Sequence, residues 1–227
     1  MKKAFFNTFT IICTIAILIC SLLLVKTLYD YKKENDLYQN IKVEAYKHSK
    51  VDFKSLKKKN SEVIGWITVP GTRIDYPIVQ TSDNDKYIHT LFDGKQGGAG
   101  CIFADCRGDP FNDTLTIIYG HRMKDGSMFN NLKYYKDYSF AKNHNKITLY
   151  TPSKTYNCKI VTFATIRADN NIYNKYFTSA YDVCHELKEH TSYTYNTVSD
   201  KDKLIALSTC TYEFKNARYV LLAKLNT

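Results

Sequence analysis

Leu204-Ile205-Ala206-Leu207-Ser208-Thr209-Cys210 is followed by a polar connection, residues 211–217, and then by Arg218-Tyr219-Val220-Leu221-Leu222-Ala223-Lys224-Leu225. Both apolar runs have the length of β-strands, and their spacing predicts a hairpin, with a loop longer than the commonest two-residue turns. If the strands pair antiparallel, Cys210 faces Arg218, with Cβ atoms roughly 5 Å apart. A neighbouring cation favours the thiolate, the reactive form of cysteine. A cysteine after an apolar run is more often a small buried hydrophobic residue, so both interpretations stay open.

A second predicted strand also ends in a reactive side chain. Residues 115–119 lead to Gly120 and His121, and we expect Gly120 to let the chain turn sharply at the strand's exit. A lone histidine at a strand end is usually a loop residue, but a cysteine with a spatially adjacent histidine is a standard nucleophile arrangement. The pattern therefore makes Cys210, His121 and Arg218 candidates for one catalytic site.

The composition indicates one globular domain with a sizeable core and an appendage, since the chain has 227 residues of which 44% are apolar. The net charge of +10 comes from scattered lysines without a nucleic-acid-binding motif, so we expect no nucleic-acid partner. The seven cysteines show neither a disulfide framework nor zinc-site spacing, and we expect no metal and no cofactor. The glycine-rich segment 94–100 lacks the GxxxxGK[ST] pattern of a phosphate-binding loop.

The appendage is N-terminal. Residues 4–25 are almost wholly apolar and uncharged, and this length matches the roughly 20 residues that a helix needs to cross a bilayer. A cleaved signal peptide is the alternative, but the apolar run is too long and no small-x-small cleavage site follows. We expect a retained anchor with the N-terminus inside and the remaining chain outside. Lys26, Lys32 and Lys33 lie on the far side of the span and leave its orientation open.

Beyond the anchor the pattern changes from helical to β-rich. Residues 29–48 carry a weak helical stripe at Leu37, Tyr38, Ile41 and Ala45, and Asp52 can cap a short helix that ends before Asn60. About eight short strands with interspersed helices predict a closed or nearly closed barrel. The strands are expected at 65–69, 74–80, 101–105, 115–119, 147–150, 155–166, 204–210 and 218–225, with helices at 127–135 and 180–191.

Alternation along the 155–166 strand places Cys158 in the core, and the helical stripe at positions 180, 183, 184 and 187 buries Cys184. His185 and His190 are five residues apart and are expected at the surface. We divide the chain into a cytoplasmic tip and transmembrane anchor (1–26), a helical linker with helices (27–60) and a β-barrel catalytic domain (61–227).

Short motifs in this chain resemble those of sortases, the cysteine transpeptidases that attach proteins to Gram-positive cell walls. Leu207-Ser208-Thr209-Cys210 is similar to their L-x-T-C signature, Tyr119-Gly120-His121 to their Y-G-H segment, and Arg218 falls where their arginine lies. Several further segments resemble class B sortases, as does the long helix-bearing connection before residue 204: Gly65-Trp66-Ile67, Pro70-Gly71-Thr72, Ile74-Asp75-Tyr76-Pro77-Ile78-Val79-Gln80 and Ser127-Met128-Phe129. The resemblance covers about residues 50–227. It implies a mainly β fold, a closed eight-stranded barrel with N-terminal helices and a helix before the catalytic strand.

The resemblance also implies a membrane-anchored enzyme whose partners are surface proteins with a C-terminal sorting signal. Cys210 would attack the threonine carbonyl of an NPxTN- or (S/P)PxTG-like motif, and an amino group of peptidoglycan or its lipid-linked precursor would take the acyl group. His121 would act as general acid, and Arg218 would stabilise the oxyanion or position the substrate. The implied substrate contacts are Asn84, Tyr119, Ile172, Tyr173, Ser208 and Thr209. The acidic residue that follows the cysteine in some relatives arrives here only at Glu213.

Two alternatives remain, a thiol hydrolase, of which papain-like enzymes are the model, and a non-enzymatic protein. A thiol hydrolase of sorting-type peptides would release its acyl product to water. A papain-like enzyme would need an Asn or Asp to orient the histidine, and its cysteine would begin a helix rather than end a strand. A non-enzymatic, membrane-anchored β-domain would tolerate the loss of Cys210.

Overall fold

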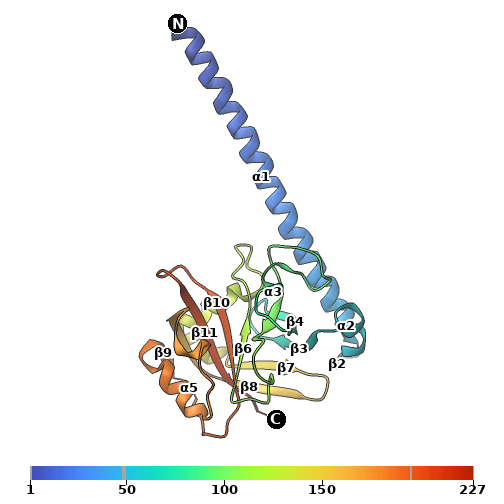
Figure 1. Cartoon of the computed structure of the whole chain (residues 1–227), viewed down its shortest axis with the longest axis vertical. Helices are drawn as coiled ribbons and strands as arrows, with labels where there is room; N and C mark the ends of the chain where they lie inside the picture. The colour runs from blue at the N-terminus through green and yellow to red at the C-terminus, as the bar shows by residue number, and fades with distance from the viewer. Residues whose placement is uncertain (1, 48–49, 195, 227) are drawn as a thin grey trace.

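An eight-stranded mixed barrel forms the body of the protein (Figure 1), described here by a computed structural model that covers residues 2–47, 50–194 and 196–226. The strands follow the order β11-β10-β6-β5-β4-β3-β7-β8, and the pairing of β8 with β11 closes the ring. The β10–β6 and β4–β5 pairs are parallel, whereas the other pairs of the ring are antiparallel. Closure leaves no unpaired strand edge around the ring, and the predicted fold class is confirmed.

The observed strands lie close to the predicted ranges. Their bounds are β3 Val63–Thr68, β4 Asp75–Val79, β5 Ile102–Ala104, β6 Leu115–Tyr119, β7 Lys146–Tyr150, β8 Thr155–Arg167, β10 Leu204–Cys210 and β11 Ala217–Lys224. The short strand β9, Thr191–Thr194, pairs with β8 outside the ring, and a small separate ladder joins β1, Tyr46–Lys47, to β2, Lys50–Val51. The sequence analysis did not predict β1, β2 or β9, which are too short to carry a clear alternation of apolar and polar residues.

Two apolar cores explain the continuous apolar run of β10. Ile205 and Leu207 belong to the core inside the barrel, while Leu204 and Ala206 belong to a second core on the barrel's outer face. Successive side chains of a strand point to opposite faces, so a strand between two cores is apolar throughout. The second core is covered by helix α5, Ala180–Leu187.

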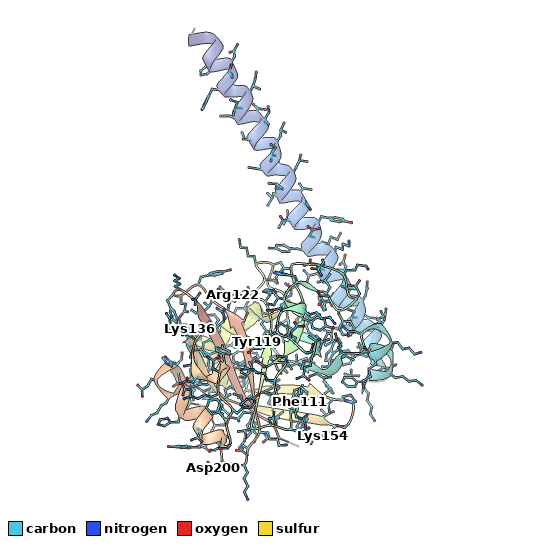
Figure 2. All side chains as sticks on the ribbon, in the orientation of Figure 1. Phe111, Tyr119, Arg122, Lys136, Lys154 and Asp200 are labelled. Carbon is cyan, nitrogen blue, oxygen red and sulfur yellow. The ribbon has the colours of Figure 1, made fainter. Side chains whose placement is uncertain are left out.

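The predicted anchor and the helical stripe that follows it form one helix, α1, Lys2–Ala45, which leaves the domain as a single rod (Figure 1). It passes position 26 without a break and ends before His48, which lies outside the described residues. The side chains of its apolar part are exposed (Figure 2), whereas Tyr38, Ile41 and Ala45 are buried against the barrel. Of the stripe, Leu37 is only partly buried.

The remaining helices are short. Asp52 caps α2, Phe53–Lys59, by accepting a hydrogen bond from the Ser55 N–H at 3.0 Å, as predicted. The segment expected as a helix at 127–135 is a 3-10 helix, η1, Phe129–Lys136. The other helical elements are α3 Lys86–His89, α4 Tyr138–Asn143, η2 Asn171–Tyr173 and η3 Lys188–His190.

Two of the three predictions about the core and surface of these elements are confirmed. Cys158 is buried, and His185 and His190 are exposed. The prediction that Cys184 is buried is wrong in degree, because this thiol is partly exposed at the edge of the α5 stripe while Ala180, Val183 and Leu187 are fully covered.

Candidate active site

Strand β10 places Cys210 between two strands that end in polar side chains. Its antiparallel pairing with β11 sets Cys210 opposite Arg218, the register that the hairpin predicted. On its other side β10 runs parallel to β6, with Ser208 opposite Tyr119. Two residues further on, the same register brings His121 beside Cys210, since neighbouring strands lie roughly 4.8 Å apart.

Hydrogen bonds continue the β6–β10 contact past the last paired residues. The Gly120 N–H donates to the Ser208 carbonyl at 3.2 Å, and the Thr209 hydroxyl donates to the Gly120 carbonyl at 2.7 Å. These bonds hold the backbone on either side of His121 against the end of β10. Thr209 thus acts on the site through the backbone that carries the histidine.

Gly120 is required for a reason other than the expected turn. It is not among the residues with positive φ, but an added Cβ would lie 2.4 Å from Ile102 Cδ1 and 2.8 Å from Phe129 Cδ2. The glycine therefore lets β6 pack closely on its neighbours just before His121, rather than supplying a left-handed backbone.

The three candidate catalytic residues line one cavity of about 420 Å³. Five of the six residues proposed as substrate contacts lie in the same cavity: Asn84, Tyr119, Tyr173, Ser208 and Thr209. Gly120 also lines it, and its wall is completed by Ile88, Phe103 and Ala168. Sequence reasoning missed these three because they come from separate segments and no local motif marks them.

Ile172, the sixth proposed contact, does not line this cavity. Its side chain is 1% exposed and packs in the outer-face core with α5. The neighbouring Tyr173 points into the cavity instead, and its hydroxyl lies 2.8 Å from the Ser208 hydroxyl. We therefore assign Ile172 to the core and Tyr173 to the cavity, where the Tyr173 ring also packs against the edge of the same core.

Cys210 differs from the buried thiols of the domain in its exposure. Its side chain is exposed at the end of β10. Burial raises the pKa of Cys101 and of Cys158 to about 12 and that of Cys184 to about 11, which keeps these thiols protonated and unreactive at neutral pH. Cys210 is thus accessible to a peptide, as a nucleophile must be.

The His121 ring is oriented by a backbone carbonyl. Its Nε2 lies 2.8 Å from the carbonyl oxygen of Ile88, at α3. A carbonyl oxygen can only accept, so Nε2 carries a hydrogen, and Nδ1 is the nitrogen left to take up or release a proton. The ring of His89 stacks on that of His121 with centroids 5.9 Å apart.

An ion pair between a buried carboxylate and an exposed guanidinium connects the two aromatic walls of the cavity. Asp105, 6% exposed, accepts hydrogen bonds from the Tyr119 hydroxyl and from Arg107 Nε, both at 2.8 Å. Arg107 also donates to the backbone carbonyl of Tyr173. Burial by itself would raise the pKa of Asp105, but the hydrogen bonds from Arg107 and Tyr119 outweigh it and hold this pKa below its ordinary value. The carboxylate therefore stays charged and ties Tyr119 to the segment that carries Tyr173.

The Tyr173 hydroxyl stays protonated beside the thiol. Burial raises the pKa of Tyr173 to about 12, and its ring stacks on Tyr119 with centroids 6.3 Å apart. The wall next to Cys210 is consequently aromatic and neutral, with the Tyr119 hydroxyl engaged by Asp105 and the Tyr173 hydroxyl by Ser208.

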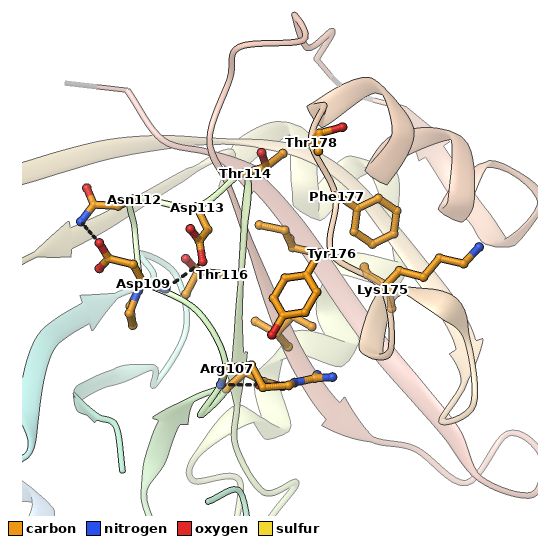
Figure 3. Close-up of a pocket in the computed structure, with 15 residues that line it drawn as sticks. Arg107, Asp109, Asn112, Asp113, Thr114, Thr116, Lys175, Tyr176, Phe177 and Thr178 are labelled. Carbon is orange, nitrogen blue, oxygen red and sulfur yellow. Dashed lines mark hydrogen bonds and ion pairs between the residues drawn. The ribbon is translucent and has the colours of Figure 1, made fainter. Parts of the chain in front are cut away.

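Another cavity, of about 510 Å³, shares no lining residue with the first and is shown in Figure 3. Cys210 does not line it. Two of its acidic residues are engaged within their own loop, since Asp113 accepts from the Asp109 N–H at 2.7 Å and Asp109 from the Asn112 side chain at 3.0 Å, and the third, Asp105, is held by Arg107 and Tyr119. Within the described residues, no group of three His, Cys, Asp or Glu side chains could hold a metal ion.

The loop after Cys210 is held by Glu213. Its carboxylate accepts from Lys136 Nζ at 2.6 Å and from the Tyr219 hydroxyl at 2.7 Å. The Arg122 guanidinium lies 5.5 Å above the Tyr212 ring, and Figure 2 shows Arg122 and Lys136 at this end of the domain. Glu213 thus serves to fasten the loop, in keeping with its late position after the cysteine.

Comparison with known proteins supports this arrangement. The sequence model of the sortase domain matches residues 67–226. The chain is 38% identical to sortase B of Listeria monocytogenes, over 78% of this chain and 74% of that protein. It is 28% identical to sortase B of Staphylococcus aureus, over 98% of this chain and 97% of that protein. A solved Staphylococcus aureus sortase B–substrate complex superposes with a TM-score of 0.79 at 27% identity, covering 88% of this chain and 99% of that one.

Proposed function

The chain belongs to the sortase family, as a sortase B-type cysteine transpeptidase, and on this premise we propose that Cys210, His121 and Arg218 carry its reaction. The observation that supports this assignment most strongly is their convergence. They come from three adjacent strand ends, β6, β10 and β11, and line one cavity that is open to a peptide. The β10–β11 hairpin accounts for the pairing of Cys210 with Arg218, but His121 is remote in sequence and has no structural need to join them at an exposed site.

The proposed reaction has two steps. The Cys210 thiolate attacks the carbonyl carbon of a threonine in the sorting motif, and a tetrahedral oxyanion forms. His121, protonated at Nδ1, donates that proton to the leaving amine as the C–N bond breaks, which leaves a thioester on Cys210. An incoming amine then attacks the thioester, returns a proton to His121 and releases the thiolate.

Arg218 is placed to stabilise the tetrahedral oxyanion. Its guanidinium offers a planar fork of N–H donors, and one of these, on Nη1, donates to the Ala217 carbonyl at 3.0 Å. The remaining donors are available to the oxyanion beside Cys210. Asn84 is held by its own bond, since its Oδ1 accepts from the Cys106 N–H at 2.8 Å, which leaves its NH₂ group to donate to a bound peptide.

The proposed substrate is a surface protein with an NPxTN- or (S/P)PxTG-like sorting signal, and the proposed acceptor is an amino group of peptidoglycan or its lipid-linked precursor. The stacked Tyr119 and Tyr173 suit the apolar face of an extended peptide, and the opening suits an amine that approaches from solvent.

The proposed location is the extracellular face of the membrane. Among the described residues, one helix is long and apolar enough to cross a bilayer, with a mean hydropathy of 2.7 in its most apolar window. An apolar helix of this kind is consistent with an anchor or a signal sequence. We propose a retained anchor with the N-terminus inside, which would hold the enzyme beside substrates emerging from the membrane.

A peptide panel tests the function. The full chain, reconstituted in vesicles or detergent, is incubated with fluorogenic NPxTN- and (S/P)PxTG-type peptides, with and without an added amine, and products are identified by mass spectrometry. We expect cleavage after threonine and a ligated amide product when the amine is present. Cleavage that never yields the amide would favour the thiol hydrolase, and turnover unaffected by a thiol-blocking reagent would exclude cysteine catalysis.

Replacing Arg218 by lysine separates its two possible roles. The change keeps the positive charge but loses the planar set of guanidinium N–H donors. We therefore expect kcat to fall about 10²-fold if the guanidinium stabilises the oxyanion. If it mainly holds the substrate backbone, KM rises and kcat changes little. Steady-state kinetics with the preferred peptide make the distinction.

Arg167→Lys is the matched control for this variant. Arg167 lies opposite Ala217 on β8, but its side chain is exposed and pairs with Asp169. An ion pair this exposed contributes little to stability, so both constants should stay near wild type. A normal kcat and KM for Arg218→Lys would remove Arg218 from the mechanism.

A further inference from the structure

Glu34 is a buried carboxylate on the anchor helix that the reaction does not use. Its side chain is 8% exposed, and its two oxygens accept hydrogen bonds from the N–H groups of Gly98 and Ala99, at 2.8 and 3.0 Å. A Cβ added to Gly97 would lie 2.6 Å from Glu34 Oε1. The backbone of the glycine-rich segment 94–100 thus binds the Glu34 carboxylate.

The segment 94–100 in turn holds α3. The Gly97 N–H donates to the His89 carbonyl at 2.9 Å, and the Cys101 N–H donates to the Tyr87 carbonyl at 3.0 Å. Gly100 has a φ of +54°, and a Cβ there would lie 2.4 Å from the carbonyl oxygens of Tyr87 and Ile88. The backbone of α3 therefore rests directly on this segment.

The anchor helix reinforces the same contact from a second position. The Tyr38 hydroxyl donates to the Gly100 carbonyl. Tyr38 and Glu34 are four residues apart and lie on one face of α1. Two residues of the helix thus hold the C-terminal half of the 94–100 segment: Glu34 binds Gly98 and Ala99, and Tyr38 binds Gly100.

α3 contacts the catalytic imidazole. The Ile88 carbonyl accepts the hydrogen bond from His121 Nε2 at 2.8 Å, and the His89 ring stacks on His121. Three sets of hydrogen bonds therefore connect Glu34 to His121: carboxylate to segment 94–100, that segment to α3, and α3 to the imidazole.

We propose that Glu34 is a positioning residue for His121. Its charged carboxylate satisfies two backbone N–H groups at once, and such charge-assisted bonds are stronger than neutral ones. The bonds hold the Ile88 carbonyl where His121 Nε2 can donate to it, which directs Nδ1 towards the reacting atoms. The inference rests on the proposed role of His121 as the proton donor.

Glu34→Gln tests the connection in the full chain. Glutamine has one acceptor oxygen and a donor NH₂ group, so one N–H of the 94–100 segment loses its partner. We expect kcat for acyl transfer to fall about 10-fold, because a displacement of about 1 Å can cost up to about 10²-fold. KM should stay within about twofold of wild type, because Glu34 lies outside the cavity and its replacement leaves the binding of the peptide substrate unchanged.

Glu44→Gln is the matched control. Glu44 lies on the same helix and loses the same charge, but its side chain is 49% exposed and paired with Lys59 at the surface. This variant should keep the wild-type kcat and KM.

A readout that needs no turnover reports on the imidazole itself. The His121 ring signals of the isotope-labelled chain are followed by NMR as a function of pH and assigned with His121→Gln. The ring faces the His89 imidazole and shares the cavity with the Cys210 thiol and the Arg218 cation. None of these groups is changed in Glu34→Gln, so a shifted titration midpoint or an altered Nε2–H signal in that variant alone reports a displaced His121.

Gly97→Ala disturbs the same contact from the opposite side and serves if Glu34→Gln folds poorly. The added methyl group would press on Glu34 Oε1 and on both Cδ atoms of Leu91, so we expect a loss of kcat at least as large. The double variant should lose less than the product of the two single losses, because both changes act on one contact.

Equal kcat values and equal His121 titrations for Glu34→Gln, Glu44→Gln and wild type would overturn the proposal. An inactive wild-type chain would refute the proposed function instead. In that case a His121 signal displaced only by Glu34→Gln would still support the connection between helix and imidazole.

Discussion

Replacing Cys210 by alanine is expected to lower acyl transfer by at least about 10³-fold, because the variant has no nucleophile to form the thioester. The loss should appear in kcat, while peptide affinity, measured by titration without turnover, changes little. The cavity keeps its aromatic wall and its cation, and removal of an exposed thiol should not perturb the fold. The measurement is the rate of amide product formation with a labelled amine, together with a search for the thioester by intact-mass spectrometry.

Cys184→Ala is the control for this change. Its thiol is partly exposed on α5, and burial raises its pKa to about 11, so it is a poor nucleophile at neutral pH. We expect this variant to react like wild type. Incorporation of the labelled amine at the wild-type rate by Cys210→Ala would exclude Cys210 as the nucleophile, whereas no incorporation by the wild-type chain would favour a non-enzymatic β-domain.

Replacing His121 by glutamine is expected to lower kcat by about 10²–10⁴-fold, the usual contribution of a positioned general acid or base. Glutamine can still donate to the Ile88 carbonyl, 2.8 Å from Nε2 in the native protein, but it has no titratable nitrogen. The dependence of kcat on pH near neutrality should therefore flatten as well. The pH–rate profile of the variant measures both effects.

His89→Gln distinguishes proton transfer from loss of a neighbouring ring. The His89 side chain stacks on His121 but is exposed and does not line the cavity. We expect its kcat to stay within several-fold of wild type with an unchanged profile shape. If the two histidine variants behave alike, His121 acts by packing and not by proton transfer.

Much of the barrel could be predicted because the pattern of apolar residues along a strand indicates which of its faces are buried. The run from Leu204 to Leu207 is apolar at every position, and the structure explains this by a core on each face of β10. The opposition of Cys210 and Arg218 followed from the hairpin alone, since an antiparallel pair fixes which residues face each other. The helix at the N-terminus was equally evident from its uninterrupted apolar composition.

Other elements could not be predicted for identifiable reasons. The choice between Ile172 and Tyr173 depends on how a three-residue helix is turned, and that is decided by the outer-face core that receives Ile172. The role of Gly120 was misread because sequence suggests a turn, whereas the structure requires close packing on Ile102 and Phe129. Asp105 and Arg107 carried no motif, and only the meeting of Tyr119 with the Tyr173 segment gives them a function.

The sequence by itself determined the apolar strands, the N-terminal helix, the family and the three side chains proposed for the chemistry, because periodicity and short motifs are properties of neighbouring residues. Only the tertiary structure decided which residues wall the cavity, how His121 is turned and that Glu34 is tied to it. Those features depend on contacts between segments separated by tens of residues, such as the Glu34 carboxylate and the N–H groups of Gly98 and Ala99. Such contacts form when closure of the barrel and docking of α1 bring the segments together, and no local pattern records them.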